Sequence, residues 1–176
     1  MKWIEIPEIE LYNELTTEII SYKGCKFKIE HSLVSVSKWE SIWKKPFLHT
    51  ELNREEWIDY IRCMTITQNV DPMAYKLIPN KLLKEIQDYV MEQKTATVIK
   101  DTGGKKRNGQ LITSELIYFW MASYNIPFEC EKWHLSRLLT LIQVCSIESA
   151  PKKKMTKNEV YERQRAINRA RRKAKR

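Results

Sequence analysis

The chain has 176 residues, and its 31 lysines and arginines outnumber its 22 aspartates and glutamates to give a net charge of +9. A hydrophobic fraction of 43% suits one globular domain with a substantial core, whereas four glycines and six prolines are too few for the many turns of a β-sandwich. No apolar run approaches the roughly 18 residues of a membrane span, so we expect a soluble, cytoplasmic protein without a membrane partner.

The first 35 residues favour β-structure. Apolar and charged residues alternate there in places, most clearly over Lys26–Glu30, which is typical of a strand with one solvated face. We expect two to four short strands in a small antiparallel sheet, with Phe27 and Ile29 on the buried face. A turn is expected over Tyr22–Cys25.

Residues 36–150 are expected to be mainly helical and to complete a globular domain of residues 1–150. Capping boxes predict the starts of two helices: Ser37 with Glu40, and Asn53 with Glu56. Apolar residues at helical spacing predict another helix over Asn80–Met91.

A β-hairpin is expected over residues 95–113. The β-branched run 95–99 suits one strand, and residues 110–113 suit its partner. Residues 101–109 between them contain three of the four glycines, which indicates an exposed loop. This loop carries three basic residues: Lys105, Lys106 and Arg107.

Two further helices are expected around Pro127. The first is capped by Thr113 or Ser114, and the second extends from Glu129 to about Cys145, so residues 113–146 are predicted to form an αα-hairpin.

Five tryptophans adjoin apolar helical stripes, which favours core positions over a surface that stacks on nucleic-acid bases. They are Trp39, Trp43, Trp57, Trp120 and Trp133.

Residues 151–176 form a basic C-terminal arm. This segment contains twelve basic residues and two glutamates, so its net charge is +10. Because the whole chain has a net charge of +9, residues 1–150 have a net charge of −1. Thr156 with Glu159 predicts a helical start, and Glu159 with Arg163 and Glu162 with Arg165 predict ion pairs. Because apolar positions are few, we expect the arm to be helical or partly disordered and to be ordered mainly by a partner. The arm is expected to bind either a polyphosphate such as a nucleic acid or an acidic protein surface, and its composition does not distinguish these two partners. The partner-binding candidates are Lys152, Lys153, Lys154, Lys157, Arg163, Arg165, Arg169, Arg171 and Arg172, together with Lys105, Lys106 and Arg107.

The sequence contains little that indicates catalysis. Cys130 and His134 are four residues apart on an expected helix, so their side chains can meet, but zinc needs three or four ligands and no neighbouring spacing supplies them. We interpret them as a core thiol beside a hydrogen-bonded histidine. The Gly103–Gly109 stretch matches neither nucleotide-binding glycine motif. We therefore expect no catalytic residue, no cofactor and no metal.

Several stretches resemble the tail assembly chaperones of long-tailed bacteriophages. The longest continues from ITSELIYFWM, at Ile112–Met121, through Ile126–Ile142. The other stretches are His31–Leu48, Asp59–Thr65 and the Pro151–Met155 junction. The similarity is patchy over Met1–Glu30 and covers most of the rest of the chain.

The resemblance implies a protein that is not an enzyme. Such chaperones bind the tape-measure protein, recruit tail-tube subunits in the cytoplasm of the infected bacterium and are generally absent from the finished particle. Two alternatives stay open: a nucleic-acid-binding protein that acts through the basic arm, and a small virion component such as a connector or tail completion protein.

Overall fold

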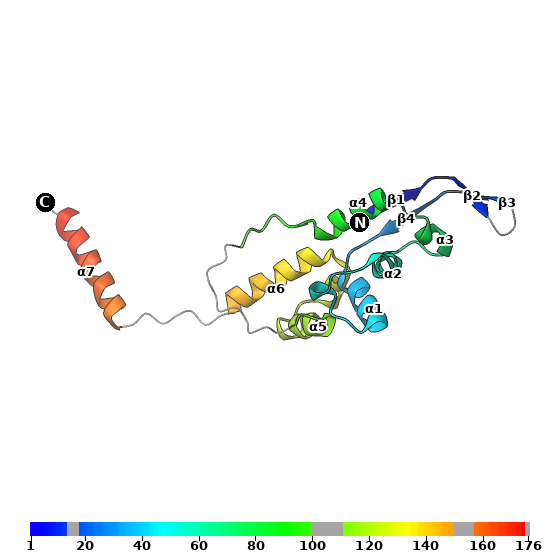
Figure 1. Ribbon diagram of the computed structural model, residues 1–176. Helices are drawn as coiled ribbons and strands as arrows, with labels where there is room; N and C mark the ends of the chain where they lie inside the picture. Colours follow the sequence, from blue (N-terminus) through cyan, green and yellow to red (C-terminus); the bar gives the residue numbers. More distant parts are fainter. Residues whose placement is uncertain (14–17, 100–110, 150–156, 175–176) are drawn as a thin grey trace. The chain divides into compact units, whose positions relative to one another are not determined.

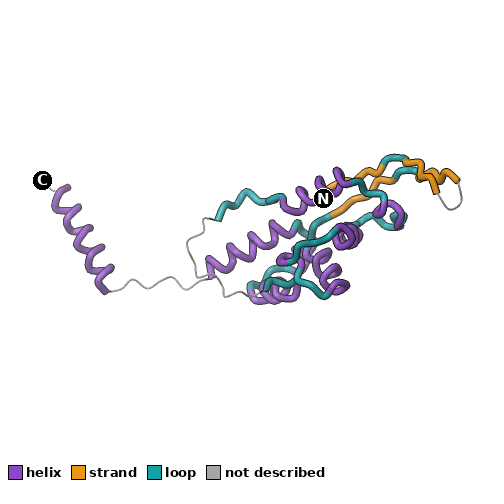
Figure 2. The backbone as a smooth tube through the Cα atoms, viewed as in Figure 1, coloured by secondary structure: helices purple, strands orange, loops and turns teal. Residues whose placement is uncertain are grey.

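The computed structural model describes residues 1–13, 18–99, 111–149 and 157–174. Helices predominate among them, and four short strands form two antiparallel pairs near the N-terminus (Figure 1, Figure 2). The predicted α+β, mainly helical fold is therefore confirmed. The strands are β1 (Lys2–Ile6), β2 (Ile9–Asn13), β3 (Glu18–Tyr22) and β4 (Cys25–Ile29). The helices are α1 (Leu33–Trp43), α2 (Arg54–Met64), α3 (Pro72–Lys76), α4 (Asn80–Met91), α5 (Ser114–Ser123), α6 (Leu135–Ser149) and α7 (Lys157–Ala174), with 3-10 turns η1 (Phe47–His49) and η2 (Phe128–Lys132).

The chain divides into two compact units, Met1–Cys145 and Ser146–Arg176. The first contains the strands, helices α1 to α5 and most of α6, and the second contains α7. The buried hydrophobic core that the structure describes belongs entirely to the first unit. Across the described ranges, no helix has the length and apolar character needed to cross a bilayer.

The strands form one interrupted antiparallel ladder. Strand β1 pairs with β4 and β2 pairs with β3, and a single register runs through both pairs because Ile6 faces Cys25 and Ile9 faces Tyr22. One face of the β1–β4 pair points into the core through Ile4, Ile6, Phe27 and Ile29. The predicted burial of Phe27 and Ile29 is therefore confirmed.

The predicted turn over Tyr22–Cys25 is wrong, because the chain continues there from one strand into the next. The register places Gly24 opposite Pro7, which has no N–H to donate, so the ladder breaks at this point. A Cβ at position 24 would overlap the carbonyl oxygen of Ile6 and lie 2.7 Å from the nitrogen of Glu8. Glycine is needed here for the close approach of two backbones rather than for a turn.

Helix α1 begins at Leu33, five residues before the start at Lys38 that Ser37 and Glu40 predict. Its cap is Ser32, whose hydroxyl accepts a hydrogen bond from the backbone N–H of Ser35 at 3.4 Å, while the Ser35 hydroxyl accepts one from the N–H of Ser32 at 3.0 Å. The earlier start adds the fully buried Leu33 to the inward face of the helix.

The other predicted capping box is confirmed. Asn53 accepts a hydrogen bond from the N–H of Glu56 at 2.9 Å, and Glu56 accepts one from the N–H of Asn53 at 2.9 Å. Helix α4 also has the bounds that its apolar stripe predicts, Asn80–Met91.

The expected β-hairpin over residues 95–113 is not formed by its described parts. Residues 95–99 and 111–113 contain no strand, and the loop with Lys105, Lys106 and Arg107 lies outside the described residues. The N–H of Lys94 donates to the Ser136 hydroxyl, and Val98 is exposed. Residues 95–99 make no ladder with a neighbouring strand, and β-branched residues alone do not make a sheet without such a partner.

The helix predicted from Glu129 begins later, at Leu135. Pro127 precedes the 3-10 turn η2, and the N–H of Leu135 donates to the carbonyl oxygen of His31 at 2.8 Å, which fixes the start of α6. Helix α5 and turn η2 pack against α1. The predicted αα-hairpin of residues 113–146 is therefore wrong, because α5 takes α1 rather than α6 as its main neighbour.

The predicted core positions of the tryptophans are confirmed for two of the five and are met only in part by the other three. Trp39 and Trp57 are buried, and three others pack against the core while partly exposed: Trp43, Trp120 and Trp133. Trp3 is the exception, with 57% of its surface exposed.

The basic arm contains a helix, as its sequence predicts. Helix α7 covers Lys157–Ala174, and the predicted pair of Glu162 and Arg165 has an N···O distance of 3.9 Å. Thr156, the first residue of the predicted capping box, lies outside the described residues.

Candidate functional site

An apolar groove of about 490 Å³ opens on the first unit, within the usual size range of ligand pockets. Five separate segments of the chain form it: His31, η1 with the residues up to Leu52, Trp57 on α2, the end of α4, and the start of α6. Figure 1 shows α4 and α6 next to one another. The apolar wall residues are Phe47, Leu48, Leu52, Trp57, Val90, Met91, Leu135 and Leu139.

A buried carboxylate holds the first wall in place. Glu40, on α1, accepts hydrogen bonds at 2.8 Å from the N–H of Phe47 through Oε1 and from the N–H of Ser114 through Oε2. The Thr50 hydroxyl donates to the carbonyl oxygen of Pro46 at 2.7 Å. Glu40 therefore fixes both the turn that carries Phe47 and the start of α5.

Hydrogen bonds between α4 and α6 hold the other two walls together. His134 Nε2 donates to the carbonyl oxygen of Tyr89 at 3.3 Å, and Lys94 N–H donates to the Ser136 hydroxyl at 3.1 Å. These polar groups are engaged within the protein, so apolar side chains dominate what the groove presents. At its rim, Met91 is 75% exposed and Leu48 is 37% exposed.

His31 lines the groove and belongs to a buried pair of histidines. Its Nδ1 lies 2.5 Å from the Tyr60 hydroxyl, and its ring centroid lies 5.0 Å from that of His134. Burial, with a smaller contribution from His134, lowers the pKa of His31 to about 3. Burial raises the pKa of Tyr60 well above its usual value. Neutral Tyr60 therefore donates to Nδ1 of a neutral imidazole that carries its proton on Nε2.

His134 is held by its own set of contacts. Ser136 Oγ lies 2.9 Å from Nδ1, and burial lowers the pKa of the imidazole. Beside it, the Tyr89 hydroxyl donates to Glu30 Oε1 at 2.8 Å. These hydrogen bonds join Glu30, Tyr89, His134 and Ser136, and so connect α4 with the start of α6 beside the groove.

The sequence did not predict this histidine pair. His31 and His134 stand far apart, and neither belongs to a motif. The predicted meeting of Cys130 and His134 on one helix is wrong, because Cys130 lies in the turn η2 and His134 precedes α6. His134 instead bonds Ser136 and Tyr89, which tertiary contacts alone bring within reach.

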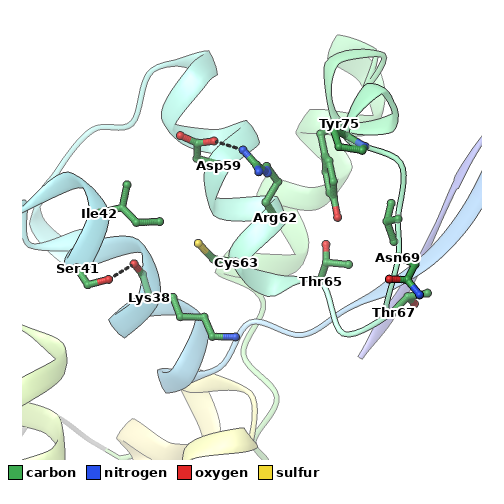
Figure 3. Close-up of a pocket in the computed structure, with 12 residues that line it drawn as sticks. Lys38, Ser41, Ile42, Asp59, Arg62, Cys63, Thr65, Thr67, Asn69 and Tyr75 are labelled. Atoms are coloured by element: carbon green, nitrogen blue, oxygen red, sulfur yellow. Dashed lines mark hydrogen bonds and ion pairs between the residues drawn. The ribbon is translucent and has the colours of Figure 1, made fainter.

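A second pocket, of about 610 Å³, lies between α1, α2 and α3 (Figure 3). Arg62 in its wall pairs with Asp59 at 3.4 Å, and Lys38 contributes a second cation. Burial, reinforced by the charge of Asp59, raises the pKa of the Cys63 thiol and so disfavours a nucleophilic thiolate. This wall mixes charged, hydroxyl and aliphatic groups, whereas the groove wall is mainly apolar and has Glu51 as the charged residue of its lining, so the groove is the better candidate for an apolar partner.

The predicted partner-binding residues fall into two groups. Helix α7 contains Lys157, Arg163, Arg165, Arg169, Arg171 and Arg172, and the four arginines from 163 to 171 are exposed. Outside the described residues lie Lys105, Lys106, Arg107, Lys152, Lys153 and Lys154. The structure thus places a cluster of predicted cations on one helix.

Within the described part of the chain, no three histidine, cysteine or acidic residues gather as a metal site. Comparisons with models of protein families, with curated proteins and with solved structures found no match to this chain.

Proposed function

We propose that this protein is a non-enzymatic tail assembly chaperone of a long-tailed bacteriophage. It holds the tape-measure protein and recruits tail-tube subunits during tail assembly. The observation that supports this best is the apolar groove, because a wall of Phe47, Leu52 and Leu139 suits an apolar surface of another protein better than a polar substrate.

The partner suited to the groove is an amphipathic helix. A tape-measure protein is a long helical chain whose apolar positions are exposed until the tube encloses them. Such a helix inserts side chains at i, i+3 or i+4 and i+7 into a groove of this kind. Met91 at the rim is flexible and polarisable, and it adapts to side chains of different shape. This adaptability suits a holder that binds successive segments.

The proposed site of action is the cytoplasm of the infected bacterium, before the particle is complete. A chaperone of this kind releases the tape-measure protein when the tail tube covers the same apolar residues. The protein would then be absent from the finished virion, and protein analysis of purified particles distinguishes this proposal from a connector or tail completion role.

Charged residues at the groove rim are expected to abolish capture. In the double variant Leu48→Asp/Met91→Asp, two carboxylates would be desolvated by a bound apolar helix, which costs several kcal/mol. Co-purification with the tape-measure protein of the same phage should fall at least about tenfold, the equivalent of 1.4 kcal/mol. Both residues are exposed, so the fold should persist.

The matched control is Ile42→Asp/Phe119→Asp, which places two carboxylates at exposed apolar positions away from the groove. This control should capture the tape-measure protein to within about twofold of the unmodified protein. Equal capture by both double variants would remove the groove from the mechanism.

A further inference from the structure

Helix α7 presents an unusual arrangement of side chains. Residue 158 and all residues from 161 to 171 are exposed. The helix has 18 residues and is therefore about 27 Å long at 1.5 Å per residue. Since its described side chains are solvated, their chemistry indicates what the helix contacts.

The exposed arginines occupy two opposite sides of α7. At about 100° per residue, Arg165 and Arg169 lie about 40° apart, and Arg163 and Arg171 lie about 80° apart. The midpoints of these two pairs are about 180° apart around the helix. The helix therefore carries cations along both flanks rather than along one stripe.

The two faces between these flanks differ from one another. Gln164 and Asn168, four residues apart, share one face, and Ala166 and Ala170 share the opposite one. Glu162 pairs with Arg165 at 3.9 Å and lies about 140° from the amide face at helical spacing. One face thus carries two amides and the exposed Tyr161, over whose ring Arg165 lies at 5.0 Å, and it lies between two flanks that carry arginines, one of which also carries Glu162.

We propose that α7 binds in the major groove of duplex DNA. The groove is about 12 Å wide and admits an α-helix of about 10–12 Å diameter, with a phosphate strand on each side. The arginine pairs lie where the two strands run, and Gln164 and Asn168 face the base edges, to which amide side chains hydrogen-bond. An acidic protein surface, by contrast, would meet only one flank of the helix.

This binding is independent of the apolar groove. The A-form major groove of duplex RNA is deep and too narrow for such a helix, so the proposal predicts a preference for DNA over RNA of the same sequence. It also predicts a steep salt dependence, because each neutralised phosphate of B-DNA contributes about 0.9 to the slope of log K against log salt.

The test uses the full chain and fluorescence anisotropy with a short duplex DNA, the matching duplex RNA and polyglutamate, between about 50 mM and 200 mM salt. The variant Arg163→Gln/Arg165→Gln/Arg169→Gln/Arg171→Gln should lower the salt slope by about 3.6 and weaken DNA binding at least about tenfold. Glutamine forms helices nearly as well as arginine, so circular dichroism should show an intact helix.

The matched control removes four exposed lysines of the first unit: Lys23→Gln/Lys76→Gln/Lys81→Gln/Lys84→Gln. It has the same net charge and should bind DNA within about threefold of the unmodified protein. The variant Leu48→Asp/Met91→Asp should also retain DNA binding, which separates this proposal from the chaperone role. Binding of RNA or polyglutamate as tightly as DNA, or an unchanged slope in the arginine variant, would overturn it.

Discussion

Replacement of Glu40 by alanine is expected to destabilise the protein by about 3–5 kcal/mol. The carboxylate is buried, and its two oxygens accept the backbone N–H groups of Phe47 and Ser114, both of which are buried. A hydrogen bond to a charged group contributes about 1.5–3 kcal/mol, and alanine leaves both donors without this acceptor. Urea denaturation of the unmodified and variant proteins measures the difference.

The isosteric variant Glu40→Gln separates the two hydrogen bonds. Its side chain keeps one acceptor oxygen and places an amide donor where the other was, so about half of the loss is expected. Glu85 lies exposed on α4, and Glu85→Ala should change stability by no more than about 0.5 kcal/mol. If Glu40→Ala were no more harmful than Glu85→Ala, Glu40 would not be the residue that holds the groove wall.

The second prediction with a large effect is that the protein loses stability in acid because His31 is buried as a neutral imidazole. The pKa of His31 is about 3 in the folded protein, against an ordinary value of 6.5 in the unfolded chain. Below pH 6.5 the unfolded chain binds a proton that the folded protein does not, so the free energy of unfolding falls as pH falls. The contribution of neutral His31 to the free energy of unfolding is fully present above pH 6.5, and it is lost progressively as the pH falls to about 3.

Between pH 7 and pH 5, His31 alone should lower the free energy of unfolding by about 2 kcal/mol. His134, whose pKa is also lowered, adds to this loss. The variant His31→Gln removes the titrating group and should show a shallower dependence of stability on pH. His49 is exposed and serves as the control site. An identical pH dependence in the unmodified protein and His31→Gln would contradict the buried, neutral imidazole.

Local signals in the sequence predicted several elements well. The capping box of Asn53 with Glu56 marks α2, and the apolar stripe over Asn80–Met91 gives the bounds of α4. The start of α1 was missed because its cap pairs two serines, Ser32 and Ser35, whereas Ser37 with Glu40 matches the usual pattern more closely. Glu40 instead turns its carboxylate inward, to the backbone of Phe47 and Ser114.

Contacts between distant segments could not be predicted in the same way. The role of Gly24 depends on the facing segment around Pro7, and the start of α6 depends on the carbonyl oxygen of His31. The groove likewise needs five separate segments, so no single stretch reveals it. The clustering of basic residues in α7 was visible in the sequence, because it needs only local spacing.

The most direct test of the central claim is hydrogen exchange of the protein alone and in complex with the tape-measure protein. A helix that occupies the groove should slow exchange in residues 47–52, 90–94 and 135–139, and should leave exchange in α5 unchanged. The variant Leu48→Asp/Met91→Asp should lose this protection. A complex that forms at full affinity while exchange in all three groove segments stays unchanged would contradict the proposal that the apolar groove holds the partner.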